Sequence, residues 1–205
     1  MSDRIFLTGT LAALLSVALA WFLYGQLSAG QAMSVEDGPG PNLVIEVAGA
    51  ANGRVVIDLL PDVAPKHVAQ IVTLARTGAY NNVAFHRVID GFMAQTGDVT
   101  YGKIGADLTQ AGTGGSDLPN IPAEFSDVAF LRGVVGMART NDPDSANSQF
   151  FIMFEPAEHL NGQYTVVGHV IEGMETVDKI KRGDPDLGGA VPENPDRMVS
   201  VTVMQ

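Results

Sequence analysis

The sequence predicts a mainly β fold: a closed antiparallel barrel capped by two α-helices and preceded by a separate N-terminal helix. Three observations favour it. Short runs rich in β-branched residues recur from position 43 to the end, only two amphipathic helical patterns interrupt them, and those two patterns lie far apart. A parallel fold would alternate strands and helices regularly, so the pattern favours a capped antiparallel barrel.

The first two strands are predicted to form a hairpin. The runs "LVIEVA" (Leu43–Ala48) and "RVVIDLL" (Arg54–Leu60) have strand length, and "GAANG" between them contains Asn-Gly, a strong signal for a tight hairpin turn. At the other end of the chain, "MVSVTVM" (Met198–Met204) alternates with period two, as a half-buried antiparallel strand does.

Two helices are expected. "APKHVAQIVTLARTG" (Ala64–Gly78) carries apolar residues at helical spacing, with a proline at its start and a glycine at its end. "EGMETVDKIKRG" (Glu172–Gly183) repeats this arrangement with Met174, Val177 and Ile180 on one side. Each pattern predicts one amphipathic helix.

The middle of the chain supplies the remaining strands. "AYNNVAFHRVIDGFMAQTGD" (Ala79–Asp98) indicates a strand, a tight turn and a second short strand. Further strands are predicted in "GVVGMART" (Gly133–Thr140), "SQFFIMF" (Ser148–Phe154) and "QYTVVGHVI" (Gln163–Ile171). The Gly-rich stretch between Thr100 and Phe125 has neither a G-x-G-x-x-G placed between strand and helix nor a Walker lysine, so its glycines indicate loop geometry and no phosphate site.

Composition limits the possible partners. The chain has 205 residues, enough for one well-packed domain, and its 12 basic against 23 acidic residues give a formal charge of −11. The basic residues form no patch, which argues against nucleic acid as a partner. There is no cysteine, and the four histidines show no metal-ligand spacing. We therefore expect no cofactor and no metal, and we expect a monomer.

The N-terminus predicts a membrane segment. After a short tail (1–4), residues 5–24, "IFLTGTLAALLSVALAWFLY", carry no charge. A helix of this length, at ~1.5 Å per residue, reaches across a ~30 Å hydrocarbon core. Arg4 precedes the segment, and the positive-inside tendency then places the rest of the chain on the non-cytoplasmic side.

We accordingly predict a single-pass anchor in the cytoplasmic membrane, a linker at 25–42 and a domain at 43–205 on the periplasmic side. The alternative is a cleaved signal peptide that releases a soluble periplasmic or secreted domain. Small residues at Ala18–Ala20 and at Gly30–Ala32 resemble cleavage sites and leave this alternative open.

A spaced motif in the middle of the chain resembles the signature of the cyclophilins, which are peptidyl-prolyl cis-trans isomerases. The residues that match it in order are Tyr80, Val83, Phe85-His86-Arg87, Val88-Ile89, Phe92-Met93 and Gln95. The stretches "GVVGMART", "NSQFFIMF" and "HLNGQYTVVGHV" resemble later blocks of the same family. The similarity covers Asn42 to Gln205 and implies an eight-stranded antiparallel barrel with a helix at each open end.

The resemblance also implies a site. It assigns catalysis to Arg87 and Gln95 and contact with a proline-containing peptide to Phe92, Met93, Ala138, Arg139, Gln149, Phe151, His159, Leu160 and Tyr164. Each of these residues alone would suit a core or a surface, and only their joint spacing indicates a site. His86 is expected on the opposite strand face, as a structural, hydrogen-bonded histidine. Three positions depart from the best-known members, with Arg139, His159 and Tyr164 standing for asparagine, tryptophan and histidine.

The expected function is acceleration of rotation about Xaa-Pro bonds in unfolded or newly exported polypeptides. The chemistry fits Arg87, because a permanently charged donor can stabilise the lone pair that the prolyl nitrogen regains in the twisted state. The rival hypothesis is a module or chaperone that binds proline segments without physiological turnover. A hydrolase is disfavoured, since the sequence has no nucleophile elbow.

Overall fold

The computed structural model describes residues 36–205. These residues belong to one compact unit that begins at Val35. The segment 5–24 and most of the linker 25–42 lie outside the described residues, so the anchor stays a prediction. Between Glu36 and the C-terminal Gln205, no helix has the length and apolar character needed to cross a bilayer.

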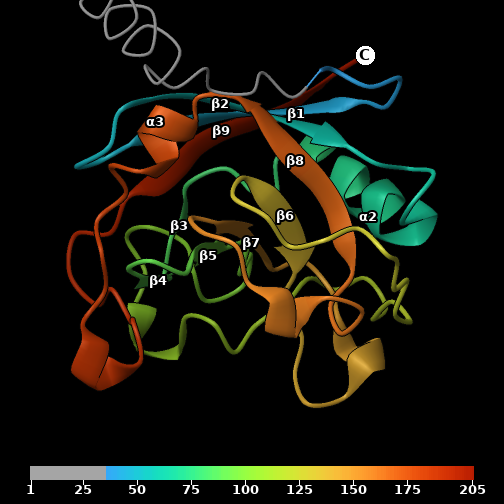
Figure 1. The fold of residues 1–205 in the computed structure, drawn as a ribbon. Coiled ribbons are helices and arrows are strands. Elements are labelled where there is room, and N and C mark those ends of the chain that lie inside the picture. Colours follow the sequence, from blue (N-terminus) through green and yellow to red (C-terminus); the bar gives the residue numbers. More distant parts are fainter. Residues whose placement is uncertain (1–35) are drawn as a thin grey trace, which may run out of the picture. The chain divides into compact units, whose positions relative to one another are not determined.

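One curved antiparallel sheet dominates residues 36–205 (Figure 1). It contains nine strands, which lie in the order β3-β9-β1-β2-β8-β6-β7-β5-β4. Their bounds are β1 Asn42–Ala48, β2 Gly53–Leu59, β3 Val83–Ala84, β4 Arg87–Ile89, β5 Met93–Thr96, β6 Val134–Met137, β7 Phe150–Met153, β8 Val166–Glu172 and β9 Arg197–Met204. The mainly β, antiparallel prediction is thus confirmed.

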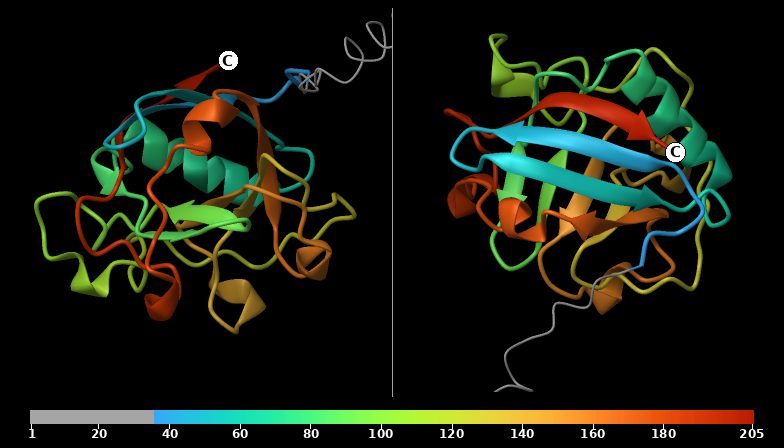
Figure 2. Two further views of the ribbon diagram at one scale, coloured as in Figure 1. Left: turned by 60° about the vertical axis from the view of Figure 1, so that its left-hand side comes forward. Right: turned by 90° about the horizontal axis from the view of Figure 1, so that it is seen from above.

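The predicted hairpin is present. β1 and β2 pair in register from Asn42 opposite Asp58 to Val47 opposite Gly53. β9 lies along the other side of β1, with a register shift after Glu46. Figure 2 shows β9, β1 and β2 side by side in the view from above.

The closed eight-stranded barrel was wrong in two respects. Residues 36–205 form nine strands, and no ladder joins the edge strands β3 and β4. These strands follow each other in the chain, but the Ala84 amide donates to the Gly102 carbonyl instead of continuing the sheet. A side chain of the neighbouring strand β5 contacts β3 instead, where the Thr96 hydroxyl donates to the Ala84 carbonyl at 2.9 Å. The sheet is therefore curled but open.

Helix α2 (Pro65–Arg76) confirms the first helical prediction and packs its apolar face on the sheet. Its N-terminus has no local side-chain cap. Instead Glu124, from the long loop, accepts hydrogen bonds from the amides of Lys66 and His67 and contacts His67 Nδ1 at 2.7 Å. Burial raises the pKa of Glu124, but these hydrogen bonds outweigh it and lower the pKa overall. No local pattern shows this distant cap.

The second helix is shorter than predicted. α3 spans only Met174–Val177, and the chain continues through single turns to Ile180. Beyond Val177 the amides of Lys179 and Ile180 donate three residues back, and the Lys181 amide donates to the buried carboxylate of Asp196, at 2.6 Å, so the helix does not resume. The prediction that it reaches Gly183 was wrong because this partner is distant in sequence. Four short 3-10 turns complete residues 36–205: η1 Leu108–Gln110, η2 Pro143–Ser145, η3 Glu158–Leu160 and η4 Pro185–Leu187.

The interior core fills the space between the curved sheet and α2. Its largest fully buried side chains include Tyr80, Phe85, Ile57 and Phe150. The rings of Tyr80 and Phe150 meet edge to face, 5.7 Å between centroids, and the Tyr80 hydroxyl donates to the Ser148 carbonyl at 2.9 Å. This core fixes β7, whose opposite face looks toward a second apolar cluster.

Candidate active site

A continuous chain of polar side chains crosses β4, β5 and the start of β7. Arg87 pairs with Gln95 in the sheet register, and its Nη1 donates to Gln95 Oε1 at 3.2 Å. Gln95 Nε2 in turn donates to Gln149 Oε1 at 2.9 Å. Gln149 Nε2 ends the chain on the carbonyls of Gly112 and Gly114, at 3.0 and 2.7 Å. The three predicted polar residues are thus linked to one another.

The two glycines whose carbonyls end this chain are held in place through their backbone amides by Asp98, a fully buried carboxylate. Asp98 accepts hydrogen bonds from the amides of Gly112 and Gly114 at 2.7 and 2.9 Å, and also from Thr100 and Tyr101. The long Gly-rich loop is therefore wrapped around one carboxylate. Sequence reasoning missed Asp98, because its partners lie up to 16 residues away.

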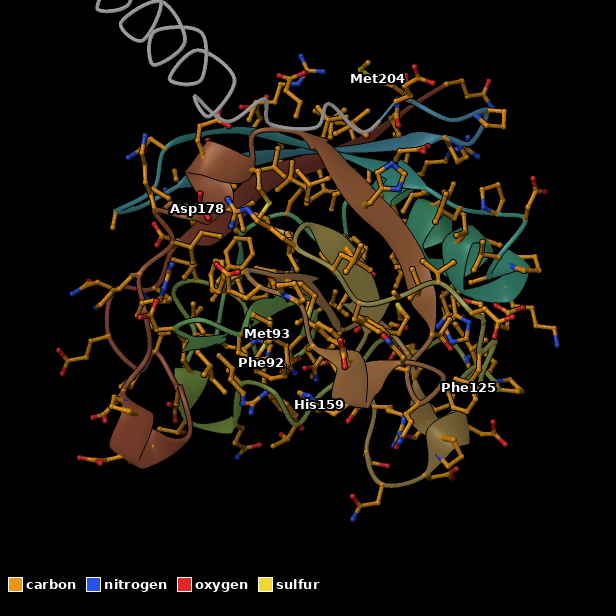
Figure 3. The ribbon with its side chains drawn as sticks, viewed as in Figure 1. Phe92, Met93, Phe125, His159, Asp178 and Met204 are labelled. Carbon is orange, nitrogen blue, oxygen red and sulfur yellow. The ribbon has the colours of Figure 1, made fainter. Side chains whose placement is uncertain are left out.

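A pocket with an apolar floor lies beside the polar chain, with a volume of about 300 Å³. Its lining residues are Arg87, Phe92, Met93, Gln95, Ala138, Arg139, Phe151, His159, Leu160 and Tyr164. Ten of the eleven residues that the sequence assigned to the site are therefore brought together here. In Figure 3 the labelled side chains of Phe92, Met93 and His159 lie close together on one side of the domain.

The pocket floor belongs to a second apolar group, here called the pocket cluster. Its buried members are Met93, Phe130, Val134, Phe151, Met153, Ala157, Leu160 and Val166. Phe151 is central: its ring stacks on Phe130 at 5.8 Å and meets Tyr164 edge to face at 5.9 Å. Gly136 makes room for these rings, since a Cβ there would lie 2.6 Å from both Phe130 and Phe151.

Two aromatic rings form the rim. The His159 ring, exposed on η3, stacks against Phe92 with centroids 5.8 Å apart. On the other side the Arg139 guanidinium lies 4.4 Å from the centre of the Tyr164 ring and donates to the carbonyls of Gln163 and Thr140. Arg139, His159 and Tyr164, the three residues that depart from the family pattern, thus all lie at the rim.

Arg139 also presents an unpaired stretch of main chain. The preceding residue, Ala138, donates its amide to the Gln149 carbonyl at 2.9 Å. Within residues 36–205, neither backbone group of Arg139 is engaged in a hydrogen bond. An extended peptide laid along the rim could pair there.

The eleventh residue, Gln149, lines a second pocket of about 580 Å³. This pocket shares Gln95, Ala138 and Arg139 with the first. The two pockets are therefore adjacent subsites along one surface, separated by the polar chain.

His86 is buried, as expected of a structural histidine, but its predicted hydrogen bond is not confirmed. Neither ring nitrogen has a partner within the described part of the chain. Burial lowers the pKa of His86 below its ordinary value, an effect that Asp98 partly offsets. The Ala84 backbone and the Gln149 side chain also lie near enough to the ring to raise its pKa.

The described residues 36–205 contain no group of three or more His, Asp or Glu side chains that could hold a metal ion. What the site offers is an apolar floor, free main-chain groups and a fixed cation. These features suit an extended peptide that carries a small apolar ring.

Comparison with known proteins identifies the family. The family model for "Cyclophilin type peptidyl-prolyl cis-trans isomerase/CLD" matches residues 43–203. The chain belongs to the cyclophilin family. It is accordingly a peptidyl-prolyl cis-trans isomerase, and its curled antiparallel sheet with two helices is the cyclophilin fold.

Several relatives show how far the likeness extends. A probable peptidyl-prolyl cis-trans isomerase of Brucella suis is 53% identical over 190 residues, covering 92% of this chain and 94% of that protein. Peptidyl-prolyl cis-trans isomerase 10 of Caenorhabditis elegans is 39% identical over 134 residues, with 63% of this chain and 77% of that protein covered.

Solved structures agree. A cyclophilin from Hirschia baltica matches with a TM-score of 0.64 and 29% identity, covering 78% of this chain and 73% of that one. A Cryptosporidium parvum cyclophilin, crystallised in the presence of the dipeptide Ala-Pro, matches with a TM-score of 0.67 and 25% identity, covering 80% and 99%.

Proposed function

We propose that Arg87 is the catalytic residue of this isomerase and donates a hydrogen bond to the prolyl nitrogen of the substrate. Rotation about an Xaa-Pro bond breaks amide resonance and meets a barrier of ~18 to 20 kcal/mol. In the twisted state the nitrogen regains a lone pair. A donor that meets this lone pair stabilises the transition state more than either planar ground state, as catalysis requires.

The observation that carries this proposal is the setting of Arg87. It lines a pocket with an apolar floor, and it is held by Gln95 at Nη1 and by the Gly188 carbonyl at Nε, 3.1 Å away. The second N–H of Nη1 and both of Nη2 remain for a ligand. A preorganised cation beside an apolar floor is worth more than the same group in water.

Binding is assigned to the rest of the site. The proline ring would lie on Phe92, Met93, Phe151 and Leu160, and the substrate backbone would pair with Gln95, Gln149 and the main chain of Arg139. Ala138, His159 and Tyr164 would complete the rim. The proposed step needs neither a metal nor a cofactor. The domain would act as a monomer.

A cis-trans exchange assay on an Xaa-Pro peptide tests the role of Arg87. Arg87→Ala should lower the exchange rate by about 100-fold, the scale seen when one preorganised donor is removed. Arg87→Lys should recover only part of this loss, since lysine keeps the charge but lacks the planar fork and is more strongly hydrated. Wild-type exchange in a folded Arg87→Ala protein would remove Arg87 from the mechanism.

We further propose that the domain works outside the cytoplasm, on exported or membrane polypeptides, held by residues 5–24. The uncharged 20-residue length of that segment supports this, as does Arg4 before it. The alignment with the Brucella suis relative covers 92% of this chain, so it extends beyond position 43 into the N-terminal part. A cleaved signal peptide remains the alternative.

Labelling in intact cells decides the location. The chain has no cysteine, so an Asp127→Cys variant carries a single thiol at an exposed position that lines neither pocket. A membrane-impermeant maleimide should label this thiol in intact spheroplasts, in a protein that sediments with membranes. Labelling only after lysis would contradict the proposal, and a labelled soluble product lacking residues 5–24 would support signal cleavage.

A further inference from the structure

The outer edge of β4, the strand that begins with Arg87, is covered by the segment 183–191, which follows α3. Three backbone hydrogen bonds join them: Gly183 N to Val88 O at 2.8 Å, Val88 N to Gly189 O at 2.7 Å and Val191 N to His86 O at 2.9 Å. Arg87 itself bridges to Ala190. This segment therefore fixes the backbone on both sides of Arg87.

The turn within this segment is closed by one residue, Asp184. Its Oδ1 accepts a hydrogen bond from the Asp186 amide at 2.8 Å and so caps η4. Its backbone amide donates to the Ala190 carbonyl, and its carbonyl accepts from the amides of Leu187 and Gly189. Side chain and main chain of Asp184 thus tie the two ends of the turn together.

This turn directs the Gly188 carbonyl toward the Arg87 guanidinium. Gly188 follows η4 in the left-handed region, at φ 66°, and its carbonyl accepts the Nε–H of Arg87 at 3.1 Å. Gln95 holds the same guanidinium at Nη1. Because a guanidinium is planar, two fixed points on its edge determine its orientation.

We propose that Asp184 is a positioning residue for the isomerase reaction, acting through the Gly188 carbonyl on Arg87. The proposal rests on the proposed catalytic role of Arg87. Asp184 does not line the pocket. Its part is to keep the turn closed, so that the Nη donors of Arg87 point at the prolyl nitrogen before the substrate twists. If the donor is not already oriented, the free-energy cost of ordering it reduces its contribution to catalysis.

Three variants distinguish the effect of losing the capping oxygen of Asp184 from the effect of losing its negative charge. Asp184→Ala removes both the capping oxygen and one negative charge. Asp184→Asn keeps a capping oxygen, since asparagine caps as well as aspartate does, and loses the charge. Asp186→Ala loses the same charge from the same turn but keeps the amide that Asp184 caps.

The first measurement is cis-trans exchange of an Xaa-Pro peptide by the full-length protein at saturating and subsaturating concentrations. Asp184→Ala should slow exchange at saturation about fivefold to tenfold, as expected for partial misplacement of a catalytic group, and should leave half-saturation nearly unchanged. Asp184→Asn and Asp186→Ala should stay within about twofold of wild type. Exchange in Asp184→Ala within twofold of wild type, or equal losses in all three variants, would overturn the proposal.

The second measurement needs no substrate. The Nε–H signal of Arg87, assigned by its absence in Arg87→Lys, should exchange with water more slowly than that of the exposed Arg76. Asp184→Ala should remove this protection, and Asp184→Asn should retain it. Equal exchange of Arg87 and Arg76 in wild type would overturn the proposal even if Asp184→Ala failed to fold. If Arg87→Ala kept full activity, the catalytic role would fail, while this protection would still report whether Asp184 orients Arg87.

Discussion

The interior core and the pocket cluster meet at β7, and two neighbouring phenylalanines on that strand belong one to each. Phe150 points inward and packs on Tyr80, whereas Phe151 points outward and stacks on Phe130. Successive side chains of a strand face opposite sides, so one strand supplies both groups. The same residue type therefore packs in the interior core at one position and lines the pocket at the next.

The two groups differ in what surrounds them. The interior core lies between α2 and the sheet, while the pocket cluster continues into Phe92, Ala138 and Tyr164, which are partly exposed and line the pocket. Apolar surface left open in this way favours a ligand that can cover it. The polar chain from Arg87 to Gln149 runs beside this surface. From this comparison we propose three separate tasks: the interior core stabilises the domain, the pocket cluster binds the peptide, and the polar chain sets the rate.

The largest effect is expected in the interior core. Phe150→Ala removes a side chain that is 1% exposed and leaves a cavity against Tyr80. The free energy of unfolding should fall by about 3 to 5 kcal/mol, the range for buried Phe→Ala changes. Urea denaturation measures it. A loss below about 1 kcal/mol would show that this cluster is not the main source of stability.

The next effect belongs to the pocket cluster. Phe151→Ala should weaken binding of an Xaa-Pro peptide by about 30-fold, since burying one large apolar side chain contributes about 2 kcal/mol. Calorimetric titration of the folded variant gives the dissociation constant. Unchanged affinity would mean that the proline ring does not lie on Phe151.

A smaller effect is expected from the far end of the polar chain. Gln149→Ala leaves Gln95 Nε2 and the carbonyls of Gly112 and Gly114 without their partner. Exchange at saturating peptide should slow by about tenfold, because Gln95 no longer holds Arg87 in a fixed position. If binding weakened while the saturated rate stayed constant, Gln149 would belong to the binding surface alone.

The smallest effect concerns pH. The pKa of His86 is lowered, chiefly by burial, so below about pH 6.5 the unfolded chain binds a proton that the folded domain does not. Stability should therefore fall as pH drops below 6.5, by at most about 1.4 kcal/mol per pH unit from this group. The His86→Gln variant should show a shallower dependence in denaturation at pH 7 and pH 5.5. Parallel curves for both proteins would contradict this.

The sequence predicts those parts of the fold that local patterns determine. The β1–β2 hairpin follows from its Asn-Gly turn, and α2 follows from its apolar spacing and terminal residues. The early end of α3 and the open edge at β3 do not, because each depends on a hydrogen bond to a distant segment, Lys181 to Asp196 and Ala84 to Gly102.

The same division holds for the site. Its lining residues could be named because their spacing resembles a family, and the structure brings ten of them around one pocket. Their supports could not be named. Asp98 organises a loop up to 16 residues away, and Gly188 meets Arg87 across 101 residues. A short polar residue or a glycine at a turn gives no local sign of such a partner.

The claim that binding and rate reside in different groups is tested most directly by one paired NMR measurement on Arg87→Ala and Phe151→Ala. In each variant the peptide dissociation constant and the exchange rate at saturation are measured together. Arg87→Ala should bind within about threefold of wild type and exchange about 100-fold more slowly. Phe151→Ala should bind weakly yet retain most of the saturated rate. If both variants lost affinity and rate in equal proportion, the division of tasks between pocket and polar chain would be contradicted.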